Sequence, residues 1–376
     1  MHDRNLTAIE RRGLRQFVNL ADGHARQRLS EQASSALRDV CDRLLAAGTV
    51  DVIDSEFAFL DALGARLTTK YPDGQSHVLY SASISVDLAA KLLLRRQQTV
   101  HLMEPAFDNL AALVTLNGVP VKSIPEQAIC PVTDFDYLDK QGITSLFVIL
   151  PNNPTGARLS VEDIGRLLDW CAGHGVLLIM DMSFRLLIPD YAIDLLAEAE
   201  SRGASALIID DTGKVWSLLD TKMSVVACTK DLAREVESIC EEILLNTSAF
   251  EMELLARFLD PHGPCADELV RVRTLVAANR QIVQDTLRTS GVVPAMSPDE
   301  EMSVEWVSFG PDCEEILRDC ASRGLQLLPG RLFFWRAESA QNGREYARIA
   351  LMRDTEQVEA GCEILRAVLA GRRRVA

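Results

Sequence analysis

The sequence predicts an α/β protein whose mostly parallel sheet lies between layers of helices. Short apolar segments at 145–150, 176–181 and 206–210 have the length and composition of buried strands. Helical patterns separate these segments, and each apolar segment leads directly into polar residues. In parallel α/β sheets ligands bind at the carboxyl ends of the strands, so these polar residues are candidates for a functional site.

The remaining elements extend the alternation in both directions. A helical pattern covers 35–47, and Ser160 has the position of a cap for the helix that follows it. The other predicted elements are a strand at 77–81, a helix near 85–96, a strand near 99–103, a helix from 107 to about 116, a helix near 192–201, a strand near 223–227 and a long helix near 264–289. We predict an N-terminal lid and arm over 1–35, a large domain over 36–255 and a smaller C-terminal domain over 256–376.

Composition excludes several classes of protein. The 376 residues are 48% hydrophobic and 25% charged, which is typical of a globular enzyme-sized chain. The chain has no apolar run long enough to span a membrane and no apolar signal core at its start. Nine scattered cysteines without metal-ligand spacing indicate reduced thiols, no metal site and a cytoplasmic location. A net charge of −15 argues against a nucleic-acid partner.

Three strand ends carry an amide, a carboxylate and an amine. Asn153 lies in Pro-Asn-Asn-Pro-Thr-Gly after the strand at 145–150, Asp181 ends the strand at 176–181, and Lys214 follows the strand at 206–210. These groups match the needs of pyridoxal 5′-phosphate: a Schiff-base lysine, a carboxylate for the ring nitrogen and a donor for the ring hydroxyl. The alternative, a surface lysine and a helix-capping aspartate, requires three coincidences.

These motifs, with Ser183 and Phe184 after the aspartate, resemble the fold-type I aminotransferases of class I/II over most of the chain. The resemblance implies a large domain with a seven-stranded, mostly parallel sheet and a smaller C-terminal α/β domain. It also implies a homodimer. Further cofactor-binding residues implied by position are Ser81, Ala82 and Ser83 at a strand-to-helix turn, Phe107 stacked on the ring, and Ser183, Thr212 and Lys222. Arg348 matches the arginine that binds a substrate α-carboxylate, in which role a guanidinium is suited to bidentate contact.

Some of these positions have simpler readings or depart from the family pattern. Phe107 could equally be a core phenylalanine, and an arginine at a strand edge such as Arg348 is often solvated. Ser81 replaces the usual glycine, and Lys222 replaces an arginine that would bind phosphate through two donors. Phe184 replaces a tyrosine that donates to the ring hydroxyl, which indicates chemistry other than plain transamination.

The N-terminal segment narrows the resemblance. Ala21-Asp22-Gly23-His24-Ala25-Arg26-Gln27, together with the segments around Glu10, Phe107 and Lys214, resembles the pyridoxal-phosphate- and oxygen-dependent L-arginine hydroxylases/oxidases. By this resemblance L-arginine is the substrate, dioxygen is the co-substrate, and His24 lies near the cofactor. Glu10, Thr7 and Asp211 would contact the guanidinium, and Asn153 would also contact substrate. We expect the first dozen residues to close as a lid when arginine binds.

The reaction implied is removal of the α-proton by Lys214, transfer of electrons to dioxygen and release of 4-hydroxy-2-oxoarginine or 2-oxoarginine with ammonia and hydrogen peroxide. Such an enzyme would serve natural-product biosynthesis. Three alternatives stay open: an arginine desaturase-type oxidase, a plain aminotransferase of a basic amino acid, and a non-catalytic relative or transcription regulator. The complete Lys214, Asp181 and Asn153 set, and the absence of a basic helix-turn-helix extension, disfavour the last.

Overall fold

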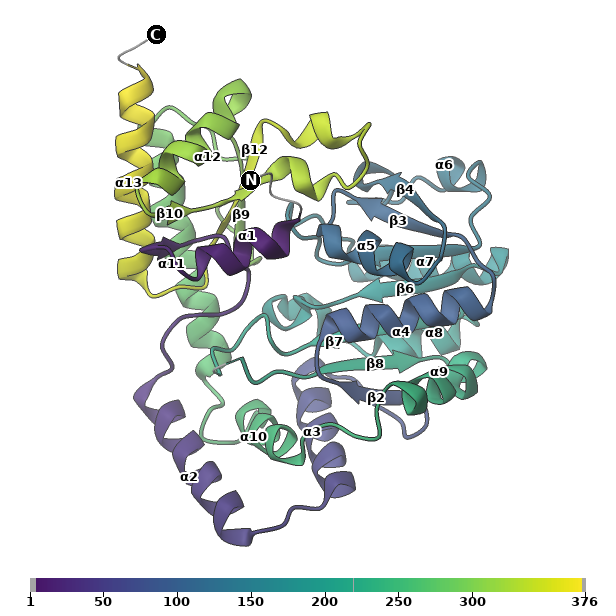
Figure 1. Ribbon diagram of the computed structural model, residues 1–376. Helices are drawn as coiled ribbons and strands as arrows, with labels where there is room; N and C mark the ends of the chain where they lie inside the picture. The colour runs from purple at the N-terminus through teal and green to yellow at the C-terminus, as the bar shows by residue number, and fades with distance from the viewer. Residues whose placement is uncertain (1–4, 219, 374–376) are drawn as a thin grey trace.

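The computed structural model describes residues 5–218 and 220–373. It contains a central sheet of seven strands, which Figure 1 shows among the helices. Their order across the sheet is β2-β8-β7-β6-β5-β3-β4, and β8 alone runs antiparallel to its neighbours. The mostly parallel sheet that the sequence predicts is therefore confirmed. The strands are β2 (Ser76–Leu79), β3 (Val100–Glu104), β4 (Val121–Pro125), β5 (Ser145–Ile149), β6 (Leu177–Asp181), β7 (Ala206–Asp211) and β8 (Ser224–Cys228).

Strand register brings the polar strand ends to one edge. Ile149 of β5 pairs with Asp181 of β6, which in turn pairs with Ile209 of β7. The backbone continues this ladder past the strands, since Leu150 N donates to Asp181 O at 2.9 Å and Met182 N donates to Ile209 O at 2.8 Å. Residues that follow these three strands consequently emerge side by side, as the parallel arrangement requires.

Helices follow most strands of the sheet and pack against it. They are α4 (Ala82–Arg95), α5 (Asp108–Leu116), α6 (Phe135–Asp139), α7 (Val161–His174), α8 (Leu195–Ser201) and α9 (Lys230–Ile243). The predicted cap at Ser160 is confirmed, because its hydroxyl accepts a hydrogen bond from Asp163 N at 3.1 Å. Strands β5 to β8 are buried at every position, which explains why they read as continuous apolar runs.

The C-terminal part of the chain forms a three-stranded antiparallel sheet, β11-β12-β9, with helices beside it. Its elements are α11 (Glu268–Thr289), β9 (Val304–Ser308), α12 (Cys313–Ser322), β10 (Leu325–Gln326), β11 (Leu328–Pro329), β12 (Tyr346–Ala350) and α13 (Thr355–Arg373). A fully buried ion pair, Arg280 with Glu305, joins α11 to β9. β12 is the central strand of this sheet, and its Arg348 donates a hydrogen bond to Asn153, which follows β5 of the large sheet.

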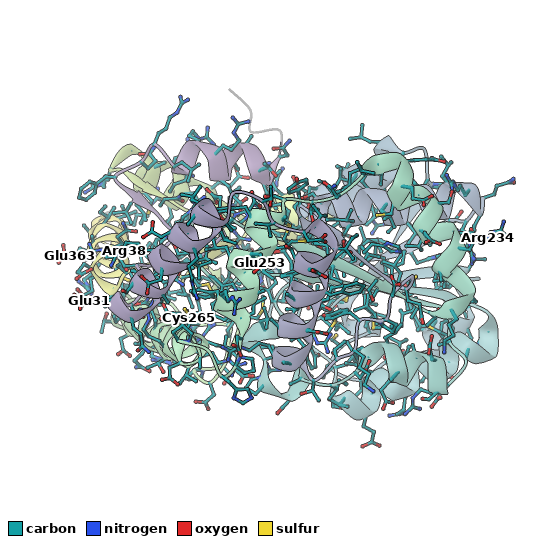
Figure 2. All side chains as sticks on the ribbon, turned by 90° about the horizontal axis from the view of Figure 1, so that it is seen from below. Glu31, Arg38, Arg234, Glu253, Cys265 and Glu363 are labelled. Atoms are coloured by element: carbon teal, nitrogen blue, oxygen red, sulfur yellow. The ribbon has the colours of Figure 1, made fainter. Side chains whose placement is uncertain are left out.

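The N-terminal segment crosses the molecule before the large sheet begins (Figure 1). Helix α1 (Leu6–Gly13) is followed by β1 (Val18–Asn19), which pairs in parallel with β10 near the other end of the chain. Helices α2 (Glu31–Ala47), α3 (Val52–Leu67) and α10 (Ala249–Leu259) then pack together. Figure 2 shows these helices from below, with Glu31 and Arg38 labelled on α2. Helices α1, α3, α6, α9 and α10 and the strands β1 and β4 were not predicted from the sequence. The predicted domain boundaries stay a prediction.

Candidate active site

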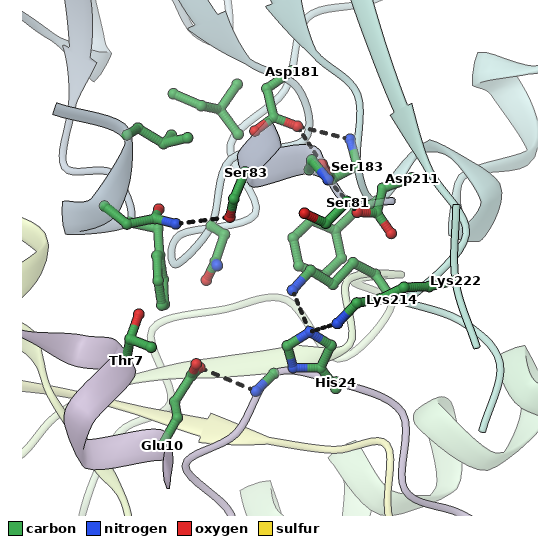
Figure 3. Close-up of a pocket in the computed structure, with 18 of the residues that line it drawn as sticks. Thr7, Glu10, His24, Ser81, Ser83, Asp181, Ser183, Asp211, Lys214 and Lys222 are labelled. Carbon is green, nitrogen blue, oxygen red and sulfur yellow. Dashed lines mark hydrogen bonds between the residues drawn. The ribbon is translucent and has the colours of Figure 1, made fainter. Parts of the chain in front are cut away.

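A cavity of about 350 Å³ opens at the carboxyl edge of the large sheet, between that sheet, the C-terminal sheet and α1 (Figure 3). Of the fifteen site residues predicted from the sequence, the cavity is lined by all but Thr212. Those present are Thr7, Glu10, His24, Ser81, Ala82, Ser83, Phe107, Asn153, Asp181, Ser183, Asp211, Lys214, Lys222 and Arg348. Residues separated by more than three hundred positions in the sequence therefore share one cavity.

Asp181 lies at the end of β6 on the floor of the cavity. Its Oδ1 accepts hydrogen bonds from Ser183 N at 3.0 Å and from Ser183 Oγ at 2.5 Å. These contacts fix the carboxylate plane and leave Oδ2 for a group in the cavity. Burial raises the pKa of Asp181, so the ionised form is costly until a cation lies against it. This is the environment that a protonated ring nitrogen would complete.

The Nε2 atom of His24 faces two lysines. Lys214 Nζ is 3.3 Å from His24 Nε2, and Lys222 Nζ is 3.4 Å from the same atom (Figure 3). On its other side His24 Nδ1 lies 2.6 Å from Asp22 Oδ1, which assigns the proton to Nδ1 and leaves Nε2 as an acceptor. The charge of Lys214 and burial together lower the pKa of His24, so the imidazole is neutral at neutral pH.

Asp22 binds the side of the His24 ring that faces away from the lysines. It is 3% exposed and accepts hydrogen bonds from His24 N at 3.0 Å and from Arg26 Nε at 3.0 Å. Burial alone would raise the pKa of Asp22, but the hydrogen bonds that His24 donates and the charge of Arg353 outweigh burial and hold the pKa well below its usual range. Asp22 is thus a fixed anion that orients His24.

The N-terminus of α4 forms an anion-binding end to the cavity. Ser81 precedes the helix with an extended backbone and makes no side-chain cap, and Ser83 Oγ accepts a hydrogen bond from Asn109 Nδ2 at 3.3 Å. Asp211 already occupies part of this end, because its Oδ2 accepts from Ala82 N at 3.0 Å. Its Oδ1 accepts from Gly213 N at 2.5 Å. Figure 3 shows Asp211 across the cavity from Glu10, its predicted partner in guanidinium binding.

Thr212 faces away from the cavity. It is 1% exposed, and its hydroxyl donates to Met223 O at 3.0 Å and accepts from Met223 N at 2.9 Å. Both hydrogen-bonding functions of the hydroxyl are therefore satisfied between β7 and β8. Through these bonds Thr212 holds the segment that carries Lys214 against Met223. The predicted contact between Thr212 and a phosphate would require these bonds to break.

Arg348 is fully buried and lines the cavity, so the solvated alternative is wrong. Its guanidinium donates to Asn153 Oδ1 at 3.1 Å, to Glu10 Oε1 at 2.9 Å and to Ala21 O at 2.5 Å. The Phe107 ring, which is half-buried and lines the cavity, lies 5.9 Å from the guanidinium carbon. One hydrogen-bonded group therefore joins the C-terminal sheet, the Asn-Pro-Thr-Gly turn and α1.

Helix α1 covers the cavity from the N-terminal side. Asn5 caps it by accepting from Ala8 N at 2.8 Å, and its buried Leu6 and Ile9 hold one face against the protein. Leu6 N donates to Asp108 Oδ2 at 2.9 Å, at the start of α5. Burial raises the pKa of Asp108 to about 6. The predicted lid segment includes residues 1–4, which lie outside the described residues.

The cavity fits pyridoxal phosphate by the chemistry of its donors. Asp181 offers a carboxylate oxygen at the floor, Lys214 offers an amine, and Asn153 offers an amide beside the Phe107 ring. The end of α4, with Ser83 and the nearby ammonium of Lys222, suits a phosphate. Asp211 is the one group of the wrong charge at that end.

Comparison with known proteins agrees with this geometry. Residues 17–365 match the aminotransferase class I and II family. The chain belongs to this family. The predicted fold-type I architecture of pyridoxal-phosphate enzymes is thereby confirmed. The structure is also similar to aspartate aminotransferase from Thermus thermophilus with maleate, with a TM-score of 0.80 and 15% identity over 98% of this chain and 97% of that chain, which shows the fold alone.

Other known proteins are more similar to this chain in sequence. MppP soaked with the product 2-ketoarginine is 31% identical, with a TM-score of 0.85, over 93% of this chain and 98% of that chain. Capreomycidine synthase of Streptomyces vinaceus is 25% identical over 287 residues, which are 73% of this chain and 72% of that protein. The putative aminotransferase YugH of Bacillus subtilis (strain 168) is 23% identical over 170 residues, so the match spans 44% of YugH.

Several contributors to the site were not predicted as site residues. Asn109 lines the cavity, Asp22 and Asp108 bind its lining segments, and the cavity is also lined by Gly23, Tyr80, Leu110, Ile149 and Phe184. Asp22 and Asp108 lie next to motifs that drew attention for other residues, namely His24 and Phe107. A carboxylate two positions before a histidine is a weak signal by itself, because only the backbone conformation at Gly23 brings the two side chains together.

Across the described residues, no helix is long and apolar enough to cross a membrane.

Proposed function

We propose that this class I and II aminotransferase relative is a pyridoxal-phosphate-dependent L-arginine hydroxylase/oxidase that uses dioxygen. The observation that carries the proposal is the Asp22–His24–Lys214 arrangement, in which an oriented neutral imidazole faces the amine 3.3 Å away. The 31% identity to MppP, whose structure was solved with 2-ketoarginine, supports an arginine-derived substrate.

When bound, pyridoxal phosphate would supply an electron sink for the substrate α-carbon. Lys214 would remove the α-proton, and His24 Nε2, which lies 3.3 Å from Lys214 Nζ, would take a proton from Lys214. Asp181 would hold a proton on the ring nitrogen through its free oxygen, with Ser183 fixing the carboxylate. Phe184 lines the cavity without a hydroxyl, so the hydrogen bond that a tyrosine would donate is missing.

Substrate would be held at both ends. Arg348 is the receptor for the α-carboxylate, because a buried guanidinium matches a carboxylate in shape and charge. Glu10 and Thr7, on α1, are the receptors for the guanidinium at the mouth of the cavity. With α1 over the opening, bulk water would be excluded while dioxygen reacts.

The proposed stoichiometry balances without a metal or a further cofactor. L-Arginine, two dioxygen and two water molecules give 4-hydroxy-2-oxoarginine, ammonia and two hydrogen peroxide molecules, with the new hydroxyl taken from water. The simpler reaction consumes one dioxygen and one water molecule and gives 2-oxoarginine, ammonia and one hydrogen peroxide. The ratio of the two products then measures how often the second oxidation occurs.

Oxygen uptake tests the proposal directly. Purified protein loaded with pyridoxal phosphate is given L-arginine without a keto acid, and the products are identified by mass spectrometry. Oxygen consumption with a hydroxylated keto acid supports the proposal, whereas an unsaturated product indicates a desaturase. A second candidate, amino transfer from a basic amino acid, is favoured by the family match, and turnover only when a keto acid is supplied would establish it.

A further inference from the structure

The two residues that would receive the opposite ends of the substrate are paired with each other. Arg348 Nη2 donates to Glu10 Oε1 at 2.9 Å, and both side chains are largely buried, at 1% and 13% exposure. Glu10 Oε1 also accepts from Gly23 N at 3.2 Å. The Glu10 carboxylate therefore occupies the Arg348 guanidinium. In the proposed function, the substrate carboxylate binds this same guanidinium.

The surroundings make this pair a compact internal contact. The backbone at Gly23 lies against the guanidinium, since a Cβ there would be 3.2 Å from Arg348 Nη2. The rings of Phe107 and Phe333 lie 5.9 and 5.5 Å from the guanidinium carbon. Arg348 Nε is buried and has no hydrogen-bond partner among the described residues. Among the described residues, the Nε hydrogen and one Nη1 hydrogen of Arg348 therefore remain for a ligand. Glu10 supplies its only carboxylate contact within that part of the chain.

A ligand that carries only a carboxylate meets a cost at this pair. It must take Arg348 from Glu10, and it leaves Glu10 as a mostly buried anion without its cation. Losing one partner of a buried pair is more costly than forming the pair is favourable. A ligand that carries only a cation leaves Arg348 in the same position. A ligand with both groups replaces one internal pair by two new pairs and strands neither charge.

We propose that Glu10 is a specificity-determining residue through its pair with Arg348, and that the pair selects ligands that carry a carboxylate and a distant cation together. This inference rests on the proposed function for the identity of the two ends. It differs from simple recognition of arginine in one respect. If Glu10 only bound the guanidinium, its removal would not change the affinity of ligands without a guanidinium.

Three probes that lack an amino group separate these cases without turnover: 5-guanidinopentanoate with both ends, pentanoate with the carboxylate only, and n-butylguanidine with the cation only. Their binding to the loaded protein is measured by isothermal titration calorimetry. In Glu10→Gln we expect pentanoate to bind at least about tenfold more tightly than in wild type, because a neutral amide competes weakly for Arg348. The same variant should bind 5-guanidinopentanoate at least about tenfold more weakly.

Glu31→Gln is the matched control, since Glu31 is an exposed carboxylate on α2 outside the cavity. It should leave all three affinities at the wild-type values. Unchanged or weaker binding of pentanoate to Glu10→Gln overturns the inference, whatever happens with the bipolar probe. If pentanoate binds more tightly but neither L-arginine nor 5-guanidinopentanoate binds wild type, the pair stands and the arginine assignment falls.

Discussion

The carboxylate behind the imidazole gives the sharpest test of the proposed proton transfer. Asp22→Asn keeps the shape of the side chain and removes its charge. In wild type Asp22 Oδ1 accepts from both Nδ1 and the backbone N of His24, at 2.6 and 3.0 Å. An amide no longer requires the proton to stay on Nδ1, so Nε2 can carry it instead. An Nε2–H would then face the ammonium of Lys214 and could not accept from it.

The size of the effect follows from this contact. A hydrogen bond to a charged group contributes about 1.5–3 kcal/mol, and the same free energy lost in the transition state lowers turnover by roughly 10- to 150-fold. The loss in the free energy of unfolding should be smaller than the loss of transition-state free energy that lowers turnover. The reason is that Arg26 keeps its ion pair with Asp220 at 3.0 Å. The assay is oxygen uptake with L-arginine, and thermal melts report the stability of each variant.

The pH dependence of turnover gives a second test, because a purely structural defect would not shift its acid limb in a defined direction. Lys214 and burial lower the pKa of His24, whereas Asp22 raises it. Removing the carboxylate therefore lowers the pKa further, and the neutral imidazole persists to lower pH. The acid limb of the rate profile should shift to lower pH in Asp22→Asn. A shift to higher pH, or turnover equal to wild type, refutes the reasoning.

Asp220→Asn is the control for that experiment. Asp220 is exposed, pairs with the same Arg26, and has a φ of +65°, a conformation that asparagine tolerates well. This variant should keep wild-type turnover and the wild-type pH profile. Equal losses in the two variants would assign the effect to the position of Arg26 instead of the tautomer of His24.

Three further predictions concern the cavity and α1. Lys214→Ala should abolish covalent attachment of pyridoxal phosphate, measured by borohydride reduction and mass spectrometry, while Lys222→Ala should keep the attachment and weaken cofactor affinity; attachment to Lys222 would contradict the assignment. Phe184→Tyr should raise the ratio of keto-acid-dependent amino transfer to oxygen uptake severalfold, because it adds the hydroxyl that aminotransferases have at this position; an unchanged ratio would count against that role. Asp108→Asn should stabilise the protein relative to wild type as pH rises from about 4 to about 6, because the raised pKa of Asp108, about 6, means that wild type loses stability when this buried carboxyl ionises. The difference in melting temperature between Asp108→Asn and wild type should therefore grow as pH rises across this range. A constant difference would contradict the destabilising effect of the ionised Asp108.

Local pattern was enough to predict the large sheet and the floor of the site. The strands β5, β6 and β7 are buried on both faces, so they read as uninterrupted apolar runs that end in polar residues. The carboxyl ends of parallel strands meet at one edge, which brings Asn153, Asp181 and Lys214 into one cavity. Each of these positions follows from a pattern a few residues long.

Short amphipathic helices were harder to predict. Helix α1 has only two buried apolar side chains, Leu6 and Ile9, among exposed polar residues. Helices α3 and α10 stabilise each other through a contact between segments almost two hundred positions apart. Isolated helices of this length are marginal in water, so packing and not propensity decides that they form.

Contacts between distant segments decided the rest of the site. The sequence determined that Arg348 and Glu10 are candidate receptors for opposite charges, but their ion pair joins residues 338 positions apart and appears only after folding. The sequence also determined a hydroxyl at Thr212 and a carboxylate at Asp211. The tertiary structure turned the hydroxyl toward Met223 and the carboxylate toward the end of α4, because each buried polar atom binds the nearest unsatisfied partner that the fold presents. The sequence thus determines which chemical group each position carries. The fold decides which partner that group binds, because it determines which strands and helices lie next to each other.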